Sequence, residues 1–275
     1  MTYVTAIQYA LSAVSGVIVG FSLGLIGGGG SILAVPLLLY FVGLSSIPNA
    51  AHVALGTTAL AVGVNAYINS YMHLRKKNVA PRVGGLFAGV GLVGALLGTY
   101  LGHVTPGQKL LLYFAIAMII LGLYIGFFRS STAGTHSEID RILEAERRCP
   151  RLTMRVLLLI AASGFVVGLI SGYFGIGGGF LIVPALMFSS GLCIARAIGT
   201  SLISVGTFGV ASGLEYAAYG DTLFLISALY VIGGVLGGYF GTNLAVRAPK
   251  KTLQRAYGII IVLVGIYMVY RVLHL

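Results

Sequence analysis

The chain has 275 residues, of which 58% are hydrophobic and only 8% are charged, and its formal net charge is +11. Soluble domains carry roughly 25% charged residues, so this composition, with a mean hydropathy of +1.00, excludes a water-soluble globular protein. The excess of lysine and arginine is typical of the cytoplasmic loops of membrane proteins, so it does not indicate nucleic-acid binding.

Ten apolar segments follow one another along the chain. Their long, continuous runs lack a period of two, which predicts an all-α integral membrane protein rather than an outer-membrane barrel. The second segment of each half is short and contains a proline, Pro36 or Pro184. The first segment has no basic stretch before it, so we interpret it as a membrane helix and not as a cleaved signal. The segments lie near residues 5–25, 31–47, 51–71, 83–102, 109–128, 154–174, 178–191, 197–217, 222–245 and 253–273.

Two glycine-rich stretches interrupt the apolar pattern, "GGGG" at 27–30 and "GIGGG" at 175–179. Glycine destabilises helices, so both stretches predict a break in the helical backbone. Apolar runs follow from Ser31 and from Phe180, and we expect both to be helical. Because amides at the start of a helix point outward with the positive end of the helix dipole, each break is a candidate anion site.

Glycines at four-residue spacing also occur elsewhere in the chain. In membrane helices, small residues at this spacing usually allow two helices to pack closely. We therefore interpret the following six as packing residues: Gly94, Gly98, Gly102, Gly233, Gly237 and Gly241.

The two halves of the chain resemble each other. A shift of 148 residues aligns the two glycine-rich breaks and the two prolines, and "LGTTAL" at 55–60 then matches "IGTSLI" at 198–203. Landmarks in the same order predict a duplicated unit. We expect a first membrane repeat at 1–128, a hydrophilic linker at 129–155 and a second membrane repeat at 156–275.

The basic residues predict the orientation of these repeats. If each half crosses the membrane an odd number of times, 15 of the 17 lysines and arginines fall on one side, which the positive-inside rule assigns to the cytoplasm. An odd number of crossings makes the repeats inverted, with both termini outside and the linker in the cytoplasm. Two alternatives stay open: segments 31–47 and 178–191 either cross, which gives ten spans, or belong to re-entrant pairs, which gives six.

Polar residues within the apolar segments are further candidates for the site. The hydroxyls of Thr57, Thr58, Thr200 and Ser201 either bind an oxyanion or cap a helix. Asn65 either contacts substrate or bonds a neighbouring helix, which is the commoner role of a membrane amide.

Few charged groups lie near the membrane segments. His52 and Arg196 supply positive charge to an anion path, although Arg196 also fits a cytoplasmic anchor. Glu215, close to Asp221, either carries a coupling proton or lies in an external loop.

The duplicated break, the "GT[ST]" motifs at 56–58 and 199–201 and the basic linker resemble the sulfite exporter TauE/SafE family over essentially the whole chain. The resemblance implies a bacterial plasma-membrane permease for sulfite, organosulfonates such as sulfoacetate, or related sulfur anions. The first break reads GGGG where the second reads GIGG, which is a mild departure between the two halves.

Other function classes lack their motifs. The sequence contains no HExxH, no GxSxG and no GK[ST] after its glycines, and Cys149 and Cys193 lie far apart. We therefore expect no enzyme activity, no cofactor and no metal. A passive anion or small-solute channel with inverted repeats is the alternative, although no "NPA" stands at the breaks.

The prediction is a secondary transporter whose partners are a small anion and the lipid bilayer. A proton is a candidate coupling ion, and exposed small-residue faces permit a homodimer. The predicted substrate-binding residues are Gly27, Gly28, Gly29, Gly30, Ser31, His52, Thr57, Thr58, Asn65, Gly175, Gly177, Gly178, Gly179, Arg196, Thr200 and Ser201.

Overall fold

The computed structural model describes residues 5–123, 153–175, 179–244 and 250–274, and all the regular structure in these ranges is helical. The linker predicted at 129–155 lies outside the described residues as far as residue 152, as do Gly177 and Gly178. The helices are α1 (Ala6–Ile26), η1 (Gly27–Leu33), α2 (Ala34–Pro36), η2 (Leu37–Phe41), η3 (Leu44–Ser46), α3 (Ala50–Arg75), α4 (Pro81–Val104), α5 (Gly107–Leu123), α7 (Met154–Tyr173), α8 (Gly179–Ser190), α9 (Ile194–Ala218), α10 (Phe224–Leu244) and α11 (Lys250–Leu273).

Each predicted apolar segment is helical where it is described, and segment 31–47 overlaps the four short helices η1, α2, η2 and η3, so the all-helical membrane fold is confirmed. Within the described residues, six helices are long and apolar enough to cross a membrane: α1, α3, α4, α7, α9 and α10. Shorter apolar helices cover 30–41, 107–123, 181–190 and 258–273. Large apolar side chains on the outer faces are exposed, for example Leu236 and Phe240 of α10, as expected for helices in lipid.

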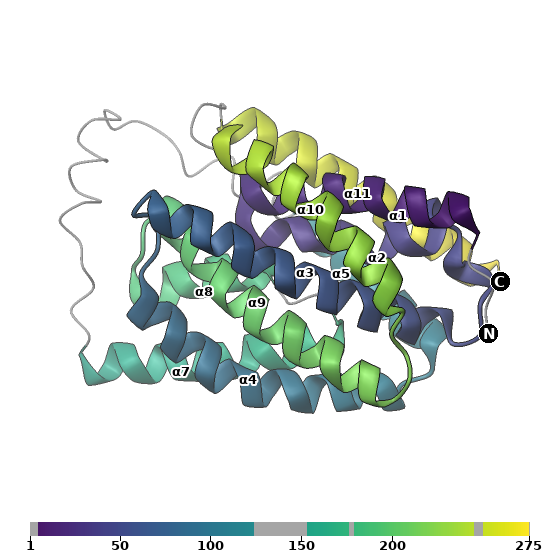
Figure 1. Cartoon of the computed structure of the whole chain (residues 1–275). Coiled ribbons are helices and arrows are strands. Elements are labelled where there is room, and N and C mark those ends of the chain that lie inside the picture. The colour runs from purple at the N-terminus through teal and green to yellow at the C-terminus, as the bar shows by residue number, and fades with distance from the viewer. Residues whose placement is uncertain (1–4, 124–152, 176–178, 245–249, 275) are drawn as a thin grey trace.

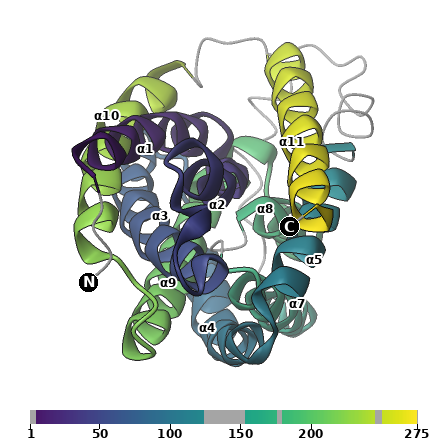
Figure 2. The same cartoon turned by 90° about the vertical axis from the view of Figure 1, so that its right-hand side faces the viewer.

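Helices α3 and α9 form the centre of the bundle (Figure 2). Helices α1 and α10 pack together on one side, α4 and α7 pack together on another, and α5 packs against α11. The central pair is antiparallel, because Gly213 contacts Leu60 whereas Gly206 contacts Tyr67. The α3–α4 and α9–α10 connections consequently lie at opposite ends of the molecule (Figure 1).

Glycines bring the outer helix pairs into backbone contact. A Cβ on Gly16 would collide with Tyr230, and one on Gly24 would collide with Gly238, so α1 and α10 run in the same direction. The six glycines predicted to serve packing are confirmed in that role. A Cβ on any of them would collide with a backbone carbonyl of α7 or α1.

The parallel arrangement recurs between α4 and α7. A Cβ on Gly168 would collide with Gly91, and one on Gly172 would collide with Ala95. Both outer pairs are therefore held by main-chain contacts, which leave no room for larger residues.

The short segment after α1 returns to the end of the molecule where α1 begins. The Nε2 atom of Gln8 donates a hydrogen bond to the carbonyl of Gly43 at 3.4 Å. Because α1 itself lies along α10, residues 27–43 run back over the same length of the bundle. Residues 5–43 thus form a hairpin whose two ends lie at the same end of the bundle, and both alternatives for segment 31–47 stay predictions.

Candidate functional site

The first glycine-rich break is wound, not open. We expected Gly27–Gly30 to precede a helix that starts at Ser31, but a 3₁₀ helix already begins at Gly27 and runs to Leu33. A 3₁₀ helix bonds an amide to the carbonyl three residues earlier, so the backbone of this break is helical and not extended. A Cβ on Gly30 would collide with the backbone of Ser22 and Leu23, which explains why the chain can tighten only with glycine here.

The second break has a different geometry. Gly175 has φ +58°, a left-handed conformation that favours glycine, and its amide donates to the carbonyl of Gly172 at 3.0 Å. A Cβ on Gly175 would stand 2.9 Å from the Cβ of Leu55 in α3. The second break therefore contacts the "LGTT" motif of the other half of the chain, and α8 begins four residues later at Gly179.

The hydroxyls of the two "GT[ST]" motifs all have partners within the protein. The Oγ1 atom of Thr57 accepts a hydrogen bond from the Leu223 amide at 3.0 Å. The Oγ1 atom of Thr200 accepts one from the Ala80 amide at 2.9 Å. The following residues, Thr58 and Ser201, donate to carbonyls of their own helices, at 2.7 Å and 2.8 Å. Only Thr57 and Thr200 therefore use their oxygen as an acceptor for a loop and keep a hydroxyl proton to donate.

The described ends of the two breaks contact different parts of α3. His73 Nε2 lies 3.3 Å from the carbonyl of Gly24, immediately before the first break, whereas Gly175 of the second break contacts Leu55. Leu55 and His73 are 18 positions apart on the same α-helix, which places them about 27 Å apart along its axis. The described ends of the two breaks, Gly24 and Gly175, therefore lie toward opposite ends of α3, and one shared anion site at the centre stays a prediction.

Each break instead lies near the motif of the opposite half. Gly175 lies beside Leu55, which leads into Gly56 and Thr57. The first break lies at the end of α3 that also carries the loop covering Thr200, and η1 packs against α8 and α9. The predicted residues thus separate into two groups at opposite ends of the bundle.

The two predicted cationic residues belong to different ends. The Nε2 atom of His52, at the start of α3, lies 3.1 Å from the carbonyl of Thr105. Arg196, at the start of the antiparallel helix α9, is half-buried. Their roles in an anion path stay predictions.

Asn65 packs against a neighbouring helix, the alternative that we considered commoner. Its Nδ2 atom donates to the carbonyl of Tyr230 at 3.5 Å, and its amide group fills the space that a Cβ on Gly234 would need. The geometry gives Asn65 a structural role in joining α3 to α10.

Ser31, which follows the first break, is fully buried.

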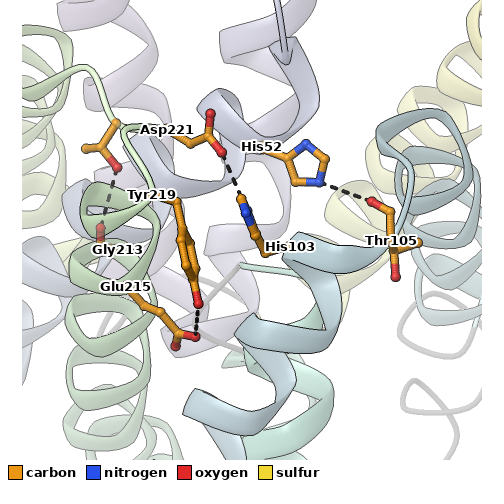
Figure 3. A network of polar contacts seen from close by, with 8 residues as sticks. His52, His103, Thr105, Gly213, Glu215, Tyr219 and Asp221 are labelled. Carbon is orange, nitrogen blue, oxygen red and sulfur yellow. Dashed lines mark hydrogen bonds and ion pairs between the residues drawn. The ribbon is translucent and has the colours of Figure 1, made fainter.

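A cluster of polar and titratable side chains lies at the end of the bundle where α4 and α9 end (Figure 3). Sequence reasoning singled out its members His52, Glu215 and Asp221 and missed His103 and Tyr219, and Glu215 lies within α9 and not in a loop. His103 Nδ1 lies 3.5 Å from Asp221 Oδ2, and the His103 ring stacks on Tyr219 with centroids 3.9 Å apart. The Tyr219 hydroxyl donates to Glu215 Oε1 at 3.4 Å. Desolvation and the Glu215 carboxylate raise the pKa of Tyr219, so its phenol stays protonated and acts as the donor.

This end of the bundle also holds polar atoms that have no partner among the described residues, such as Glu215 Oε2 and the Tyr216 hydroxyl. The described residues contain no group of three or more His, Cys, Asp or Glu side chains that could hold a metal ion. The sequence signal that could have identified His103 is its position directly after Gly102, the last glycine of the α4 stripe.

Comparison with known families decides the class of the protein. The sulfite exporter TauE/SafE family model matches residues 12–268. The chain belongs to the TauE/SafE family. It is thus a multi-pass membrane protein of a transporter family, not an enzyme, as the sequence motifs predicted.

Curated relatives support this assignment along nearly the whole chain. A "Probable membrane transporter protein" of Xylella fastidiosa (strain 9a5c) is 43% identical over 259 residues, which cover 94% of this chain and 93% of the relative. The "Probable membrane transporter protein YdhB" of Bacillus subtilis is 25% identical over 255 residues, covering 92% and 97% of the two chains. The comparison with solved structures found no match.

Proposed function

We propose that this TauE/SafE member is a secondary transporter that moves a small sulfur-containing anion, such as sulfite or an organosulfonate like sulfoacetate, across a bacterial plasma membrane. The observation that carries the proposal is the contact between Gly175, in a left-handed conformation, and Leu55 beside Gly56 and Thr57. Irregular backbone at membrane depth is tolerated where it is buried in protein or lines a cavity, and we expect the amides that follow Gly175 at such a break to bind the anion.

The arrangement of helices supports two inverted repeats, at 1–128 and 156–275. Helices α1 and α10 run in parallel, as do α4 and α7, whereas α3 and α9 oppose each other. Because α9 turns back directly into α10, and α3 into α4, helices that correspond in the two halves run in opposite directions. We propose ten crossings, with the termini outside and the linker in the cytoplasm. The end with Lys76 and Arg196 is then the inner end.

We propose two half-sites in place of one central site. The outer half-site comprises the second break at 175–179 with Thr57 and His52, and the inner half-site comprises the first break at 27–30 with Ser31, Thr200 and Arg196. An anion that leaves one half-site enters the other, while Thr58 and Ser201 support the motifs through their own helices. Hydroxyl protons and cationic side chains add to the amides as donors for an oxyanion.

Binding and flux of purified protein test this function. We expect sulfite, thiosulfate, sulfoacetate or taurine to raise the unfolding temperature, and proteoliposomes to accumulate the stabilising anion with saturable kinetics. Absence of stabilisation by every anion, together with uptake of a neutral solute, would refute the proposal. Unsaturable flux that is indifferent to pH would instead support a passive channel.

A glycine pair provides the matched variants. Gly175→Ala places a Cβ against Leu55 and strains a left-handed residue, so we expect uptake to fall at least tenfold. Gly85→Ala adds a Cβ with nothing within 4 Å and should leave uptake unchanged. Equal uptake by both variants would remove the second break from the site.

A further inference from the structure

Two short loops cover the two "GT[ST]" motifs, and they do so with the same backbone contacts. The loop 219–223 (the outer loop) donates the Leu223 amide to Thr57 Oγ1, and its Asp221 carbonyl lies where a Cβ on Gly56 would be. The outer loop therefore covers the motif beside which Gly175 also packs.

The counterpart at the other end is the loop 76–80 (the inner loop). It donates the Ala80 amide to Thr200 Oγ1, and its Asn78 carbonyl lies where a Cβ on Gly199 would be. Movement of either loop would uncover one motif, so each loop is placed to open or close one end.

The side chains that hold the two loops differ in chemistry. The inner loop is held by Lys76, whose Nζ donates to the carbonyl of Thr242 at 3.0 Å and to Asn243 Oδ1 at 3.1 Å. The outer loop is held by Asp221, which faces His103 at 3.5 Å (Figure 3). Lysine side chains keep their charge across the physiological pH range, whereas histidine ordinarily changes charge between about pH 5 and 8.

The side chain of His103 is 32% exposed and that of Asp221 is 10% exposed. The Nδ1 atom that faces Asp221 is buried and has no other partner among the described residues. An uncharged His103 would leave the Asp221 carboxylate without its cation in a poorly hydrated position, which favours release of the loop. The titratable groups that face His103 are His52 of α3, Tyr216 of α9, and Tyr219 and Asp221 of the outer loop. Tyr173 of α7 and Glu215 of α9 lie one contact further away, beside Thr105 and Tyr219.

We propose that His103 and Asp221 form a proton-binding site that acts as the outer gate of the transporter. With a proton on His103, the ion pair holds the outer loop over Gly56 and Thr57. When His103 loses the proton, the ion pair is lost and the loop is released. The gating role rests on the proposed function, since the loop controls passage only if the anion passes this motif.

Hydrogen–deuterium exchange of the outer loop tests the proposal without any substrate. The reporter is the Leu223 amide, which is bonded to Thr57. After correction for intrinsic exchange rates, we expect this peptide of the full-length protein in nanodiscs to exchange about two- to fivefold faster at pH 8 than at pH 5.5, the scale of a partly exposed ion pair. The peptide with the Ala80 amide should exchange at the same corrected rate at both pH values, without this pH step, because Lys76 holds the inner loop.

Variants at His103 give the sharper comparison. In His103→Gln, the outer-loop peptide should exchange at the faster rate at both pH values. In His103→Lys, which copies the permanent charge of the inner end, the same peptide should exchange at the slower rate at both pH values. His274→Gln, at the C-terminal end of the described residues, is the matched histidine control and should keep the wild-type dependence on pH. A full step in His103→Gln, or an equal step in both loops, would overturn the proposal.

The same samples separate this proposal from the proposed function. If no sulfur anion stabilises the protein but the His103-dependent step in exchange persists, the proton site stands and the anion assignment fails. If anions bind and the step is absent, the anion assignment stands and the outer gate fails.

Discussion

The inner and outer loops make the same backbone contacts, but different side chains hold them in place. Each follows a helix whose end is left-handed, at Lys77 with φ 57° and at Gly220 with φ 84°. Each then donates one amide to the threonine of a "GT[ST]" motif, at 2.9 Å and 3.0 Å. The repeated motif explains the shared contacts, because a glycine lets the loop carbonyl approach and the next threonine accepts the loop amide.

The side chains that hold the two loops in place differ between the two ends. A lysine holds the inner loop to the end of α10, and a histidine–aspartate pair holds the outer loop to the end of α4. The two loops thus share their backbone contacts but, in the proposed gate, respond differently to pH: the Lys76 contact does not depend on pH, and the His103 contact does. A transporter whose two ends respond differently to protons has the asymmetry that coupling to a proton gradient requires.

The largest expected effect comes from the glycines beneath the loops. Gly56→Val and Gly199→Val each place a side chain on a loop carbonyl, and we expect each to destabilise the protein by about 3 kcal/mol or to prevent folding. Thermal unfolding of purified protein measures this loss, with Gly89→Val, which meets open space, as the control. Stability equal to wild type in either variant would show that its loop does not lie on the glycine.

Removal of the threonine acceptors should give the next largest effect, and it should be equal at the two ends. Thr57→Val and Thr200→Val each leave a loop amide without its partner, a cost of about 1–3 kcal/mol. Thr→Ser at the same positions retains the oxygen and should recover most of the stability. Loss at only one end would contradict the equivalence of the two backbone contacts.

Replacement of the inner cation should have a smaller effect, independent of pH. Lys76→Met removes the bonds to Thr242 and Asn243, and we expect faster amide exchange in the inner loop by about two- to fivefold at every pH between 5.5 and 8. The outer loop in the same molecule is the internal control. A pH step at the inner loop in wild-type protein would remove the contrast between the two ends.

The smallest effect should come from the Tyr219 hydroxyl. Tyr219→Phe removes its bond to Glu215, which costs about 0.5–1 kcal/mol. Since the pKa of Tyr219 is raised above its usual value, the folded state favours the protonated phenol. Its contribution is therefore constant below the ordinary tyrosine pKa of about 10 and declines above it. The test uses the His103→Lys background, in which the outer loop is expected to stay closed; an effect of Tyr219→Phe that varies from pH 6 to 8 in that background would contradict this assignment.

The sequence predicted the helices and the packing glycines well, because both depend on local pattern. Apolar runs of sufficient length predict membrane helices, and glycines at four-residue spacing, such as Gly94 and Gly98, commonly allow close approach of another backbone. The paired "GT[ST]" motifs were also visible as matched landmarks. Their role in receiving a loop was not, since the loop residues Leu223 and Ala80 share no motif.

The sequence could not predict how the site residues are arranged in space. A repeat indicates that two segments correspond, but the distance between them depends on how the halves pack, and the antiparallel packing of α3 and α9 sends the two breaks to opposite ends. The 3₁₀ winding at Gly27 could not be distinguished from an open break by composition. His103 and Asp221 are 118 positions apart, and only the fold brings them together.

A density map of the protein in nanodiscs with a saturating sulfur anion tests the central claim most directly. The account predicts anion density at one end of the bundle, beside residues 175–179 and Thr57 or beside 27–30 and Thr200, and never in contact with both breaks. A single anion at the middle of the α3–α9 pair, close to Gly63 and Gly209 and away from both breaks, would contradict the two half-sites.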